Sequence, residues 1–466
     1  MELTKRKHRV HFVGIGGIGM SGIAEVLLNL GFPVSGSDLT ASDTTERLTS
    51  LGATIALGHH ADRVAPDVEV VVISSAVKFS NPEVVRAREL NIPVIARAEM
   101  LAELMRMKTG IAVAGTHGKT TTTSLLAHVL AEAELDPTMV IGGKVKSLGS
   151  NARLGQSTLL VAEADESDGS FLVLTPTLAI VTNIDPEHLD HYGSVERMHE
   201  AYLQFINRVP FYGLAVLCLD SVAVRALLPN VRKRFRTYGL AGDADLQAVH
   251  VQVNAEGTRF DVLERGRWIG EIRLRMLGRH NAQNALAAVA AATELGVPFA
   301  TIAHALASFD GIHRRFEIKG EVGGVTVIDD YGHHPEEVKA TLRAAREGFG
   351  RRLVAVFQPH RYSRTRDLFE SFLGAFDDAD LLVLTEIYAA GEDRIAGITG
   401  EALYEALKRR GHADVRFVAD RRAIATELVP HLRGGDMVVT LGAGDVHRVG
   451  DEVLQALTQE RPALLQ

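Results

Sequence analysis

The chain has 466 residues, the length of about three ordinary domains. Hydrophobic residues make up 46% and charged residues 23%, which is typical of a globular protein and excludes a disordered, collagen-like or coiled-coil chain. The formal net charge of −8 argues against a general nucleic-acid binder. The single cysteine, Cys218, excludes an intramolecular disulfide framework and a cysteine-built zinc site, and it fits a reducing compartment.

The basic N-terminus runs into an apolar stretch that superficially resembles a signal peptide. Glycines interrupt this stretch and no small-residue cleavage pattern follows, so we expect no signal peptide. No stretch is long and apolar enough to span a bilayer, and the Ala-rich residues 285–292 are typical of a buried helix. We therefore expect a cytoplasmic protein with no membrane partner and no nucleic-acid partner.

Strand-like apolar runs alternate with Gly-rich or polar turns and helical patterns, which is the order of parallel α/β sheets. Soft boundaries near residues 108 and 312 predict an α/β protein of three domains, at 1–108, 109–311 and 312–466. In the first, we predict strands at 10–15, 33–37, 68–73 and 94–95 and a helix at 21–30. In the second, we predict strands at 111–114, 159–162 and 178–182, a helix at 121–134, and a small antiparallel insertion at 249–274, where apolar and polar residues alternate.

In the third domain we predict strands at 325–328, 353–357, 381–384, 415–418 and 437–441, with helices at 335–346 and 363–376. The expected fold class is a Rossmann-like N-terminal domain, a central P-loop ATPase-like domain and a C-terminal Rossmann-like domain.

Residues 14–19, here called the glycine loop, form a G-x-G-x-x-G between a predicted strand and a predicted helix. Such glycines let the backbone turn tightly beside a diphosphate, and the helix N-terminus favours its charge. Asp38 lies at the end of the next predicted strand, where such folds place a ribose-binding acid. The loop could instead serve packing alone, and the pattern does not distinguish a nicotinamide cofactor from a UDP-sugar.

Residues 115–120, here called the P-loop, read G-T-H-G-K-T between a predicted strand and a predicted helix. Backbone N–H groups of such a loop hold phosphates, the Lys119 ammonium meets the β and γ oxygens, and the Thr120 hydroxyl can bind Mg²⁺. A G-K-T string occurs by chance in many loops. Its place between strand and helix, with acids downstream, favours nucleoside triphosphate binding.

Two acid-bearing segments follow later strands of the second domain. Glu163 opens E-A-D-E-S-D at 163–168, here called the acidic turn, in which Asp168 is most simply a solvated residue. Residues 185–192 carry both acids and histidines after the strand at 178–182. Mg²⁺ uses one or two protein carboxylates together with phosphates and water, so one acid at a strand end can bind it.

Longer strings resemble the Mur ligases of peptidoglycan synthesis. These strings are G-T-H-G-K-T-T-T-T at 115–123, E-A-D-E-S-D at 163–168, T-N-I-D-P-E-H-L-D at 182–190, G-R-H-N-A-Q-N at 278–284 and R-R-F-E at 314–317. Two more, D-D-Y-G-H-H-P at 329–335 and F-Q-P-H-R-Y-S-R-T at 357–365, resemble the branch of the family that adds L-alanine. The resemblance extends from Gly14 to about Gly444.

The resemblance implies an ATP-dependent ligase of peptidoglycan precursor synthesis, and so of cell-wall biogenesis, cell shape and division. It would join L-alanine to the lactyl carboxylate of UDP-N-acetylmuramate through an acyl phosphate and release ADP and phosphate. The implied ligands are UDP-N-acetylmuramate, L-alanine, ATP and two Mg²⁺ ions. We expect a monomer or a weak homo-oligomer, with the UDP-sugar on domain 1–108, ATP on 109–311 and the amino acid on 312–466.

The resemblance also implies roles for individual residues, which we list by ligand. The UDP-sugar site would contain Gly14, Gly16, Gly17, Ile18, Gly19, Ser37 and Asp38. The ATP site would contain Gly115, Thr116, His117, Gly118, Lys119, Thr120, Thr121, Asn281, Asn284, Arg315 and Asp330. The metal ligands would be Thr120, Glu163 and His188; the amino-acid site Tyr331, His333, Arg361 and Arg364; and the catalytic residues Lys119, Glu163, His188, Arg315 and His333.

Other interpretations stay open at this point. Asn281 and Asn284 could cap the helix that contains residues 285–292. Arg361 and Arg364 could be a basic first helical turn, although cations there oppose the helix dipole. A related ligase that attaches murein peptides, an NAD-dependent oxidoreductase built on the glycine loop, or a P-loop binding module are alternative functions. The oxidoreductase leaves Lys119 and Glu163 without a role, and the binding module leaves the third domain without one.

Overall fold

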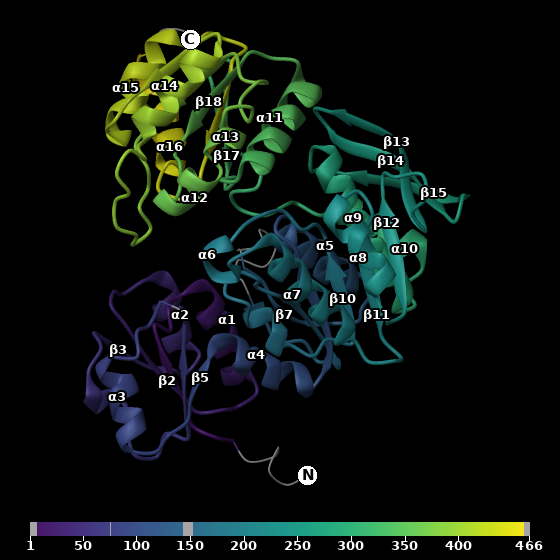
Figure 1. Ribbon diagram of the computed structural model, residues 1–466, viewed down its shortest axis with the longest axis vertical. Coiled ribbons are helices and arrows are strands. Elements are labelled where there is room, and N and C mark those ends of the chain that lie inside the picture. Colours follow the sequence, from purple (N-terminus) through teal and green to yellow (C-terminus); the bar gives the residue numbers. More distant parts are fainter. Residues whose placement is uncertain (1–6, 75, 143–151, 461–466) are drawn as a thin grey trace. The chain divides into compact units, whose positions relative to one another are not determined.

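The computed structural model describes residues 7–74, 76–142 and 152–460 and shows a mixed α/β protein with three sheets (Figure 1). The predicted fold class is confirmed. By contacts the chain forms two compact units. Unit 1 comprises Met1–Val249, Asp261–Ile272 and Gln283–Phe309, and unit 2 comprises His250–Phe260, Arg273–Ala282 and Asp310–Gln466. No helix in the described ranges is long and apolar enough to cross a bilayer.

The first sheet has five parallel strands in the order β3-β2-β1-β4-β5. Its central strand β1 is buried along its whole length, which suits the apolar run V-H-F-V. Because all strands are parallel, their carboxyl ends meet at one edge, where such folds bind ligands. The elements are β1 (Val10–Val13), α1 (Ile18–Asn29), β2 (Val34–Asp38), α2 (Asp43–Ser50), β3 (Thr54–Leu57), a 3₁₀ turn (Ala61–Arg63), β4 (Val70–Ile73), α3 (Pro82–Glu89), β5 (Val94–Ala96) and α4 (Arg97–Arg106).

The second sheet has ten strands in the order β15-β14-β13-β12-β11-β10-β6-β9-β7-β8. Its strands are β6 (Thr109–Ala114), β7 (Thr138–Val140), β8 (Ala152–Arg153), β9 (Leu159–Glu163), β10 (Leu178–Val181), β11 (Leu214–Cys218), β12 (Phe235–Gly239), β13 (Leu246–Asn254), β14 (Gly257–Glu264) and β15 (Arg267–Leu274). Its helices are α5 (Lys119–Glu132), α6 (Leu189–Tyr192), α7 (Val195–Asn207), α8 (Val222–Leu227), α9 (Arg279–Glu294) and α10 (Phe299–Ser308), with 3₁₀ turns at Ser170–Val173 and Leu228–Asn230.

Strand β6 lies between β9 and β10 and is parallel to both. The acid-bearing ends of β9 and β10 therefore flank the end of β6, where the P-loop begins. The predicted insertion at 249–274 is present as β13 to β15, and it extends the same sheet. Two-residue connections join these neighbouring strands, which requires antiparallel pairing.

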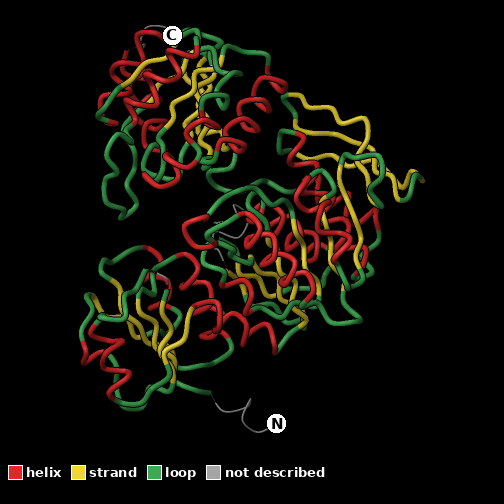
Figure 2. Tube along the Cα trace, in the orientation of Figure 1, coloured by secondary structure: helices red, strands yellow, loops and turns green. Residues whose placement is uncertain are grey.

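The third sheet has six strands in the order β16-β17-β21-β18-β19-β20, parallel except for β16 against β17. Figure 2 shows the strands in yellow and the helices in red. The strands are β16 (Glu317–Val322), β17 (Val325–Asp330), β18 (Leu353–Phe357), β19 (Leu381–Leu384), β20 (Val415–Phe417) and β21 (Met437–Leu441). The helices are α11 (Pro335–Phe349), α12 (Tyr362–Asp367), α13 (Phe369–Phe372), α14 (Gly400–Arg410), α15 (Ile424–Leu428) and α16 (His447–Glu460), with 3₁₀ turns at Arg421–Ala423 and Val429–His431.

Both faces of the third sheet are covered by apolar packing. Val354 and Val356 of β18 belong to one buried cluster, while Leu353, Ala355 and Phe357 belong to another, as the two-residue period of a strand requires. The single helix predicted at 363–376 is wrong. The chain instead forms α12 and α13, which are separated at Leu368, where φ is −110°.

Candidate active site

The P-loop contains two glycines whose conformations exclude a side chain. Gly115 has φ of +137°, and a Cβ there would lie 2.0 Å from Oγ1 of Thr182. Gly118 has φ of +79°, and a Cβ there would lie 2.5 Å from Oδ1 of Asn284. Both glycines combine left-handed φ values with close neighbours, so the sequence pattern reflects real geometric constraints.

The segment after β10 holds the P-loop in place. The side chain of Asn183 accepts a hydrogen bond from the His117 amide at 2.8 Å and donates one to the His117 carbonyl at 3.0 Å. The Asp185 amide donates to Oγ1 of Thr116 at 2.9 Å, and Nε2 of His117 lies 3.0 Å from Oδ2 of Asp185. Asn183 is a positioning residue that we did not predict individually, although it lies in the T-N-I-D-P string.

Lys119 is the first residue of α5, two residues before the predicted start of this helix. Its ammonium donates to the carbonyls of Gly115 at 2.5 Å and Thr116 at 3.1 Å. It also lies 2.8 and 2.7 Å from the two carboxylate oxygens of Glu166, which is 5% exposed. Glu166 is a second residue that the sequence analysis did not single out.

The charges around this pair shift both pKa values. Burial opposes ionisation of Lys119, but Glu166, Asp165 and Glu187 outweigh it and raise the lysine's pKa. Burial also raises the pKa of Glu166 to about 7, helped by Asp165 and opposed by Lys119. The ammonium is therefore a charged donor that protein oxygens hold at the P-loop, as phosphate oxygens would.

The three predicted metal ligands occupy suitable ends of elements. Thr120 is the second residue of α5, and Glu163 ends β9, where its Oε1 accepts the Gly142 amide at 2.6 Å. His188 precedes α6 in a left-handed conformation with φ of +56°, a backbone state that is rare outside glycine and concentrates at functional sites. Within the described ranges no cluster of three or more His, Cys, Asp or Glu residues could hold a metal.

Asn281 and Asn284 lie inside helix α9. The helix begins at Arg279, so the interpretation of these residues as caps is wrong. Nδ2 of Asn281 donates to the Leu277 carbonyl at 2.7 Å, whereas Oδ1 of Asn284 accepts from Oγ1 of Thr122 at 3.3 Å. The structure thus brings Asn284 against the P-loop and the first turn of α5, and Thr121 is buried in that same turn.

The backbone amides of glycine-loop residues 14–17 donate hydrogen bonds to oxygens of the protein itself. The amides of Gly14 and Ile15 donate to the Ser37 carbonyl at 2.8 and 3.0 Å. The Gly16 amide donates to Oδ2 of Asp38 at 2.8 Å, and the Gly17 amide donates to the Gly14 carbonyl at 3.2 Å. Gly19 follows in the first turn of α1, whose first residue is Ile18, and the Ile18 side chain lies outside the described part. Ser37 and Asp38 therefore support the loop directly.

Beneath this loop lies a buried polar network. The Glu83 carboxylate accepts from Ser37 Oγ at 2.8 Å and lies 2.8 Å from Nε2 of His11. His59 Nδ1 lies 2.9 Å from Ser37 Oγ. Burial opposes ionisation of Glu83, but the bonds from His11 and Ser37 outweigh it and lower its pKa. The network holds the end of β2 in place, and this end carries Ser37 and Asp38, whose oxygens accept hydrogen bonds from the glycine loop.

Unit 2 carries the remaining predicted residues: Arg315 before β16, Asp330 at the end of β17, Tyr331 and His333 after β17, and Arg361 and Arg364 after β18. The Asp330 carboxylate accepts the amides of Phe316 and Gly332 at 2.8 and 2.7 Å. Burial raises the pKa of Asp330 to about 6, although Arg315 and these amides act in the opposite direction. The Arg315 guanidinium lies 5.3 Å from the ring centre of Tyr331 and 3.9 Å from Oε1 of Glu337.

Four rings form a contact series beside these groups. Tyr331 meets His333 at 5.5 Å between ring centres, His333 meets His360 at 5.6 Å, and His360 stacks on Tyr388 at 5.6 Å. Nη1 of Arg364 lies 3.2 Å from Nδ1 of His360 and from its carbonyl oxygen. The structure thus brings together Tyr331, His333 and Arg364, and it adds His360 and Tyr388, which the sequence analysis did not single out.

Arg361 lies on the same loop in an unusual backbone conformation. Its φ of +71° and ψ of +138° fall outside the regions that non-glycine residues ordinarily adopt. Its amide donates to the Tyr388 carbonyl at 2.9 Å, and its guanidinium is 3.9 Å from Oε1 of Glu392. Arg361 precedes α12 and Arg364 is the third residue of α12, so only Arg364 belongs to a basic first turn.

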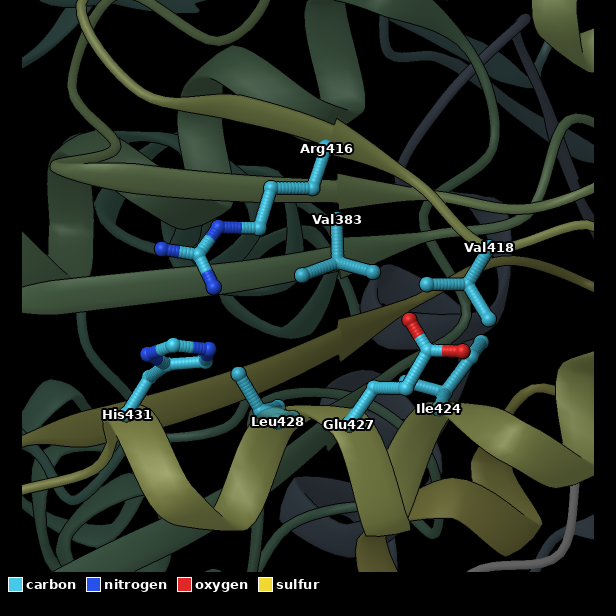
Figure 3. Close-up of a pocket in the computed structure, with 7 residues that line it drawn as sticks. All are labelled: Val383, Arg416, Val418, Ile424, Glu427, Leu428 and His431. Atoms are coloured by element: carbon cyan, nitrogen blue, oxygen red, sulfur yellow. The ribbon is translucent and has the colours of Figure 1, made fainter.

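A separate cavity lies beside β19, β20 and α15, and none of the predicted site residues lines it. Figure 3 shows the Arg416 guanidinium and the His431 ring at one side of the cavity, next to the aliphatic side chains of Val383 and Leu428. Its lining comprises Val383, Arg416, Val418, Ile424, Glu427, Leu428 and His431. This cavity therefore adds nothing to the phosphate or amino-acid chemistry described above.

Three family models match successive parts of the chain. "Mur ligase family, catalytic domain" matches residues 9–109, "Mur ligase middle domain" matches 113–292 and "Mur ligase, glutamate ligase domain" matches 314–444. A UDP-N-acetylmuramate–L-alanine ligase of Myxococcus xanthus is 58% identical over 458 residues, which is 98% of this chain and 97% of that protein. The chain belongs to the Mur ligase family.

Solved structures place this Mur ligase among its relatives. The crystal structure of the UDP-N-acetylmuramate-alanine ligase MurC from Thermotoga maritima matches with a TM-score of 0.82 at 31% identity, covering 97% of this chain and all of that one. A murein peptide ligase from Psychrobacter arcticus matches with a TM-score of 0.69 at 25% identity, covering 97% and 98%. Both likenesses extend through all three matched parts of the Mur ligase.

Proposed function

We propose that this Mur ligase joins L-alanine to the lactyl carboxylate of UDP-N-acetylmuramate, with conversion of ATP to ADP and phosphate. The observation that carries the proposal is Lys119, an ammonium held at the P-loop between the acid-bearing ends of β9 and β10. The 58% identity to a UDP-N-acetylmuramate–L-alanine ligase supports the choice of substrates.

The first step makes a leaving group, because a carboxylate is a poor electrophile. A lactyl carboxylate oxygen attacks the γ-phosphorus, the bond to the β-γ bridging oxygen breaks, and ADP leaves with an acyl phosphate remaining. Lys119 stabilises negative charge that develops on the phosphoryl oxygens. Asn183 and Asp185 hold the P-loop in the conformation that presents its donors.

In the second step the neutral alanine amine attacks the acyl carbon, the carbon–oxygen bond breaks, phosphate leaves with the former carboxylate oxygen, and the nitrogen loses one proton to solvent or to the departing phosphate. We propose that Arg361 and Arg364 bind the alanine carboxylate, since guanidinium groups pair with carboxylates through two hydrogen bonds. Tyr331 and His333 form the adjoining wall, and Arg315 binds ATP phosphates. Asn281, Asn284 and Asp330 contribute to the nucleoside part of the ATP site.

The residues present fit Mg²⁺. Thr120 and Glu163 would hold one Mg²⁺ beside the ATP phosphates, with Glu163 as its carboxylate, and His188 would hold a second Mg²⁺. When bound, Mg²⁺ neutralises phosphate charge during transfer.

We assign the ligands by region: the UDP-sugar to residues 1–108, ATP to 109–311 and the amino acid to 312–466. The reaction needs small molecules only, so we propose no nucleic-acid or membrane partner, a cytoplasmic location with access to ATP, and a monomer or weak homo-oligomer.

Phosphate release with ATP and UDP-N-acetylmuramate, scanned over amino acids and short peptides, tests the proposal. We expect L-alanine to give the fastest release, with one ADP for each UDP-linked product. Release that required a murein peptide would instead identify a peptide ligase like the relative from Psychrobacter arcticus. Product without ADP would contradict phosphorylation altogether.

A further inference from the structure

Arg97 lies against Gly19, which ends the glycine loop and belongs to the first turn of α1. It is the first residue of α4, directly after β5, and so at the same carboxyl edge of the first sheet as the glycine loop. A Cβ built on Gly19 would lie 3.0 Å from Cδ and Nη1 of Arg97 and 3.2 Å from its Nε. Because Gly19 has no side chain, the Arg97 guanidinium can occupy this space.

The guanidinium has spare hydrogen-bonding capacity. Within the described residues its hydrogen-bond partner is Asp165 of the acidic turn, whose Oδ2 accepts from Nη2 at 3.1 Å. The side chain is 22% exposed, and a guanidinium has five N–H donors. One acceptor leaves most of these donors available to a ligand.

The glycine loop, by contrast, has few spare donors, because within the described part of the chain only its Ile18 and Gly19 amides, which begin α1, remain for a ligand. The amides of residues 14–17 all donate to oxygens of Gly14, Ser37 or Asp38. Donors from elsewhere would therefore strengthen the binding of a diphosphate at this loop. In addition, Arg97 lies at the N-termini of two helices, its own and α1, where the Asp165 carboxylate pairs with it.

We propose that Arg97 binds the diphosphate of the UDP-sugar, as a residue of the site that the glycine loop begins. This inference rests on the proposed function and adds a binding residue to it. Arg97 would supply a cation for the phosphates at the glycine loop, as Lys119 does at the P-loop. Each is the first residue of a helix, and each is held by an acid of the acidic turn, Asp165 or Glu166.

Calorimetric titrations of the full chain with uridine, UDP and UDP-N-acetylmuramate test this, with ADP at saturation to fill the P-loop. We expect Arg97→Ala to weaken binding of both diphosphates on the order of tenfold to a hundredfold and uridine less than twofold. Arg97→Lys should recover only part of the diphosphate affinity, because an ammonium lacks the paired, coplanar N–H donors of a guanidinium. Arg106→Ala is the matched control, an exposed arginine at the other end of α4 that pairs with Glu103, and it should bind like wild type.

Three results would overturn the inference. Arg97→Ala could bind UDP as wild type does, or it could lose uridine and UDP affinity equally, which would indicate a change of pocket shape. Arg97→Lys could bind UDP no better than Arg97→Ala while its uridine binding is intact. A wild-type chain that binds no uridine compound would overturn the proposed function as well, so the two failures are distinguishable.

Discussion

The glycine loop and the P-loop are built alike but handle charge differently. Each follows a buried central strand and leads into a buried helix, β1 to α1 and β6 to α5. The P-loop carries its cation in its own sequence, as Lys119. The glycine loop carries none, and the guanidinium that lies against its Gly19 comes from Arg97 of α4, much later in the chain.

The acidic turn connects the two loops. Glu166 holds Lys119 and Asp165 holds Arg97, so adjacent residues position the cations of both loops. A glycine pattern alone therefore defines the backbone shape of a phosphate site, while the cation determines how strongly it binds an anion. The following changes test this difference, from the largest expected effect to the smallest.

Lys119→Ala should lower turnover by about 10²–10³-fold, since it removes charge stabilisation at the transferring phosphoryl group. The KM of UDP-N-acetylmuramate should change little, because the glycine loop does not use this lysine. Steady-state kinetics measure both. Lys408→Ala, an exposed lysine of α14, is the control and should keep full activity. Turnover within threefold of wild type would refute the P-loop assignment.

Arg361→Ala changes neither phosphate loop. Loss of its charge-assisted bonds should raise the KM of L-alanine about tenfold to a hundredfold, with the KM of ATP and of the UDP-sugar within twofold. Initial rates with each substrate varied in turn give these constants. An equal rise in all three would reject the carboxylate-binding role.

Gly118→Ala should damage the P-loop, because Gly118 combines a φ of +79° with a Cβ position 2.5 Å from Asn284. The left-handed conformation alone costs about 1–2 kcal/mol. Gly266→Ala isolates that cost, since Gly266 has the same φ of +79° and nothing within 4 Å. Thermal unfolding should show a loss in both variants, whereas only Gly118→Ala should raise the KM of ATP. Equal kinetics in the two variants would contradict the close contact.

Glu166→Gln should alter how stability depends on pH. A carboxyl whose pKa rises to about 7 on folding binds more protons in the folded state, so wild-type stability relative to the variant should fall between about pH 4.5 and 7. The pKa of about 7 already includes the opposing effect of Lys119, and a rise from 4.5 to about 7 corresponds to a loss of about 3 kcal/mol, which lowers the unfolding midpoint. Midpoints measured at pH 5 and 7.5 with a parallel pH dependence in both proteins would show that Glu166 does not titrate there.

Local patterns were enough to predict much of the fold and the P-loop. Strands such as β6 and β18 are short apolar runs, and G-K-T fixes a strand-to-helix turn whatever surrounds it. The partners of these residues depend on packing between distant segments. Arg97 and Asp165 are 68 residues apart, and Asn183 lies 66 residues from His117, so no local period marks them.

The two structural predictions that are wrong, the capping role of Asn281 and Asn284 and the single helix at 363–376, both concern where a helix begins or ends. Helix α9 begins at Arg279, earlier than its Ala-rich core suggests, and this places Asn281 and Asn284 inside the helix instead of at its cap. The helix predicted at 363–376 breaks at Leu368, because periodicity alone does not show where a turn interrupts an amphipathic run.

Isotope transfer tests the phosphorylation chemistry most directly. UDP-N-acetylmuramate labelled with ¹⁸O in both lactyl carboxylate oxygens would be incubated with ATP, Mg²⁺, L-alanine and the full chain, and the released phosphate analysed by mass spectrometry. If the carboxylate attacks the γ-phosphorus, each phosphate carries one ¹⁸O atom. Phosphate free of label, released in step with product, would contradict an acyl phosphate and with it the role assigned to Lys119.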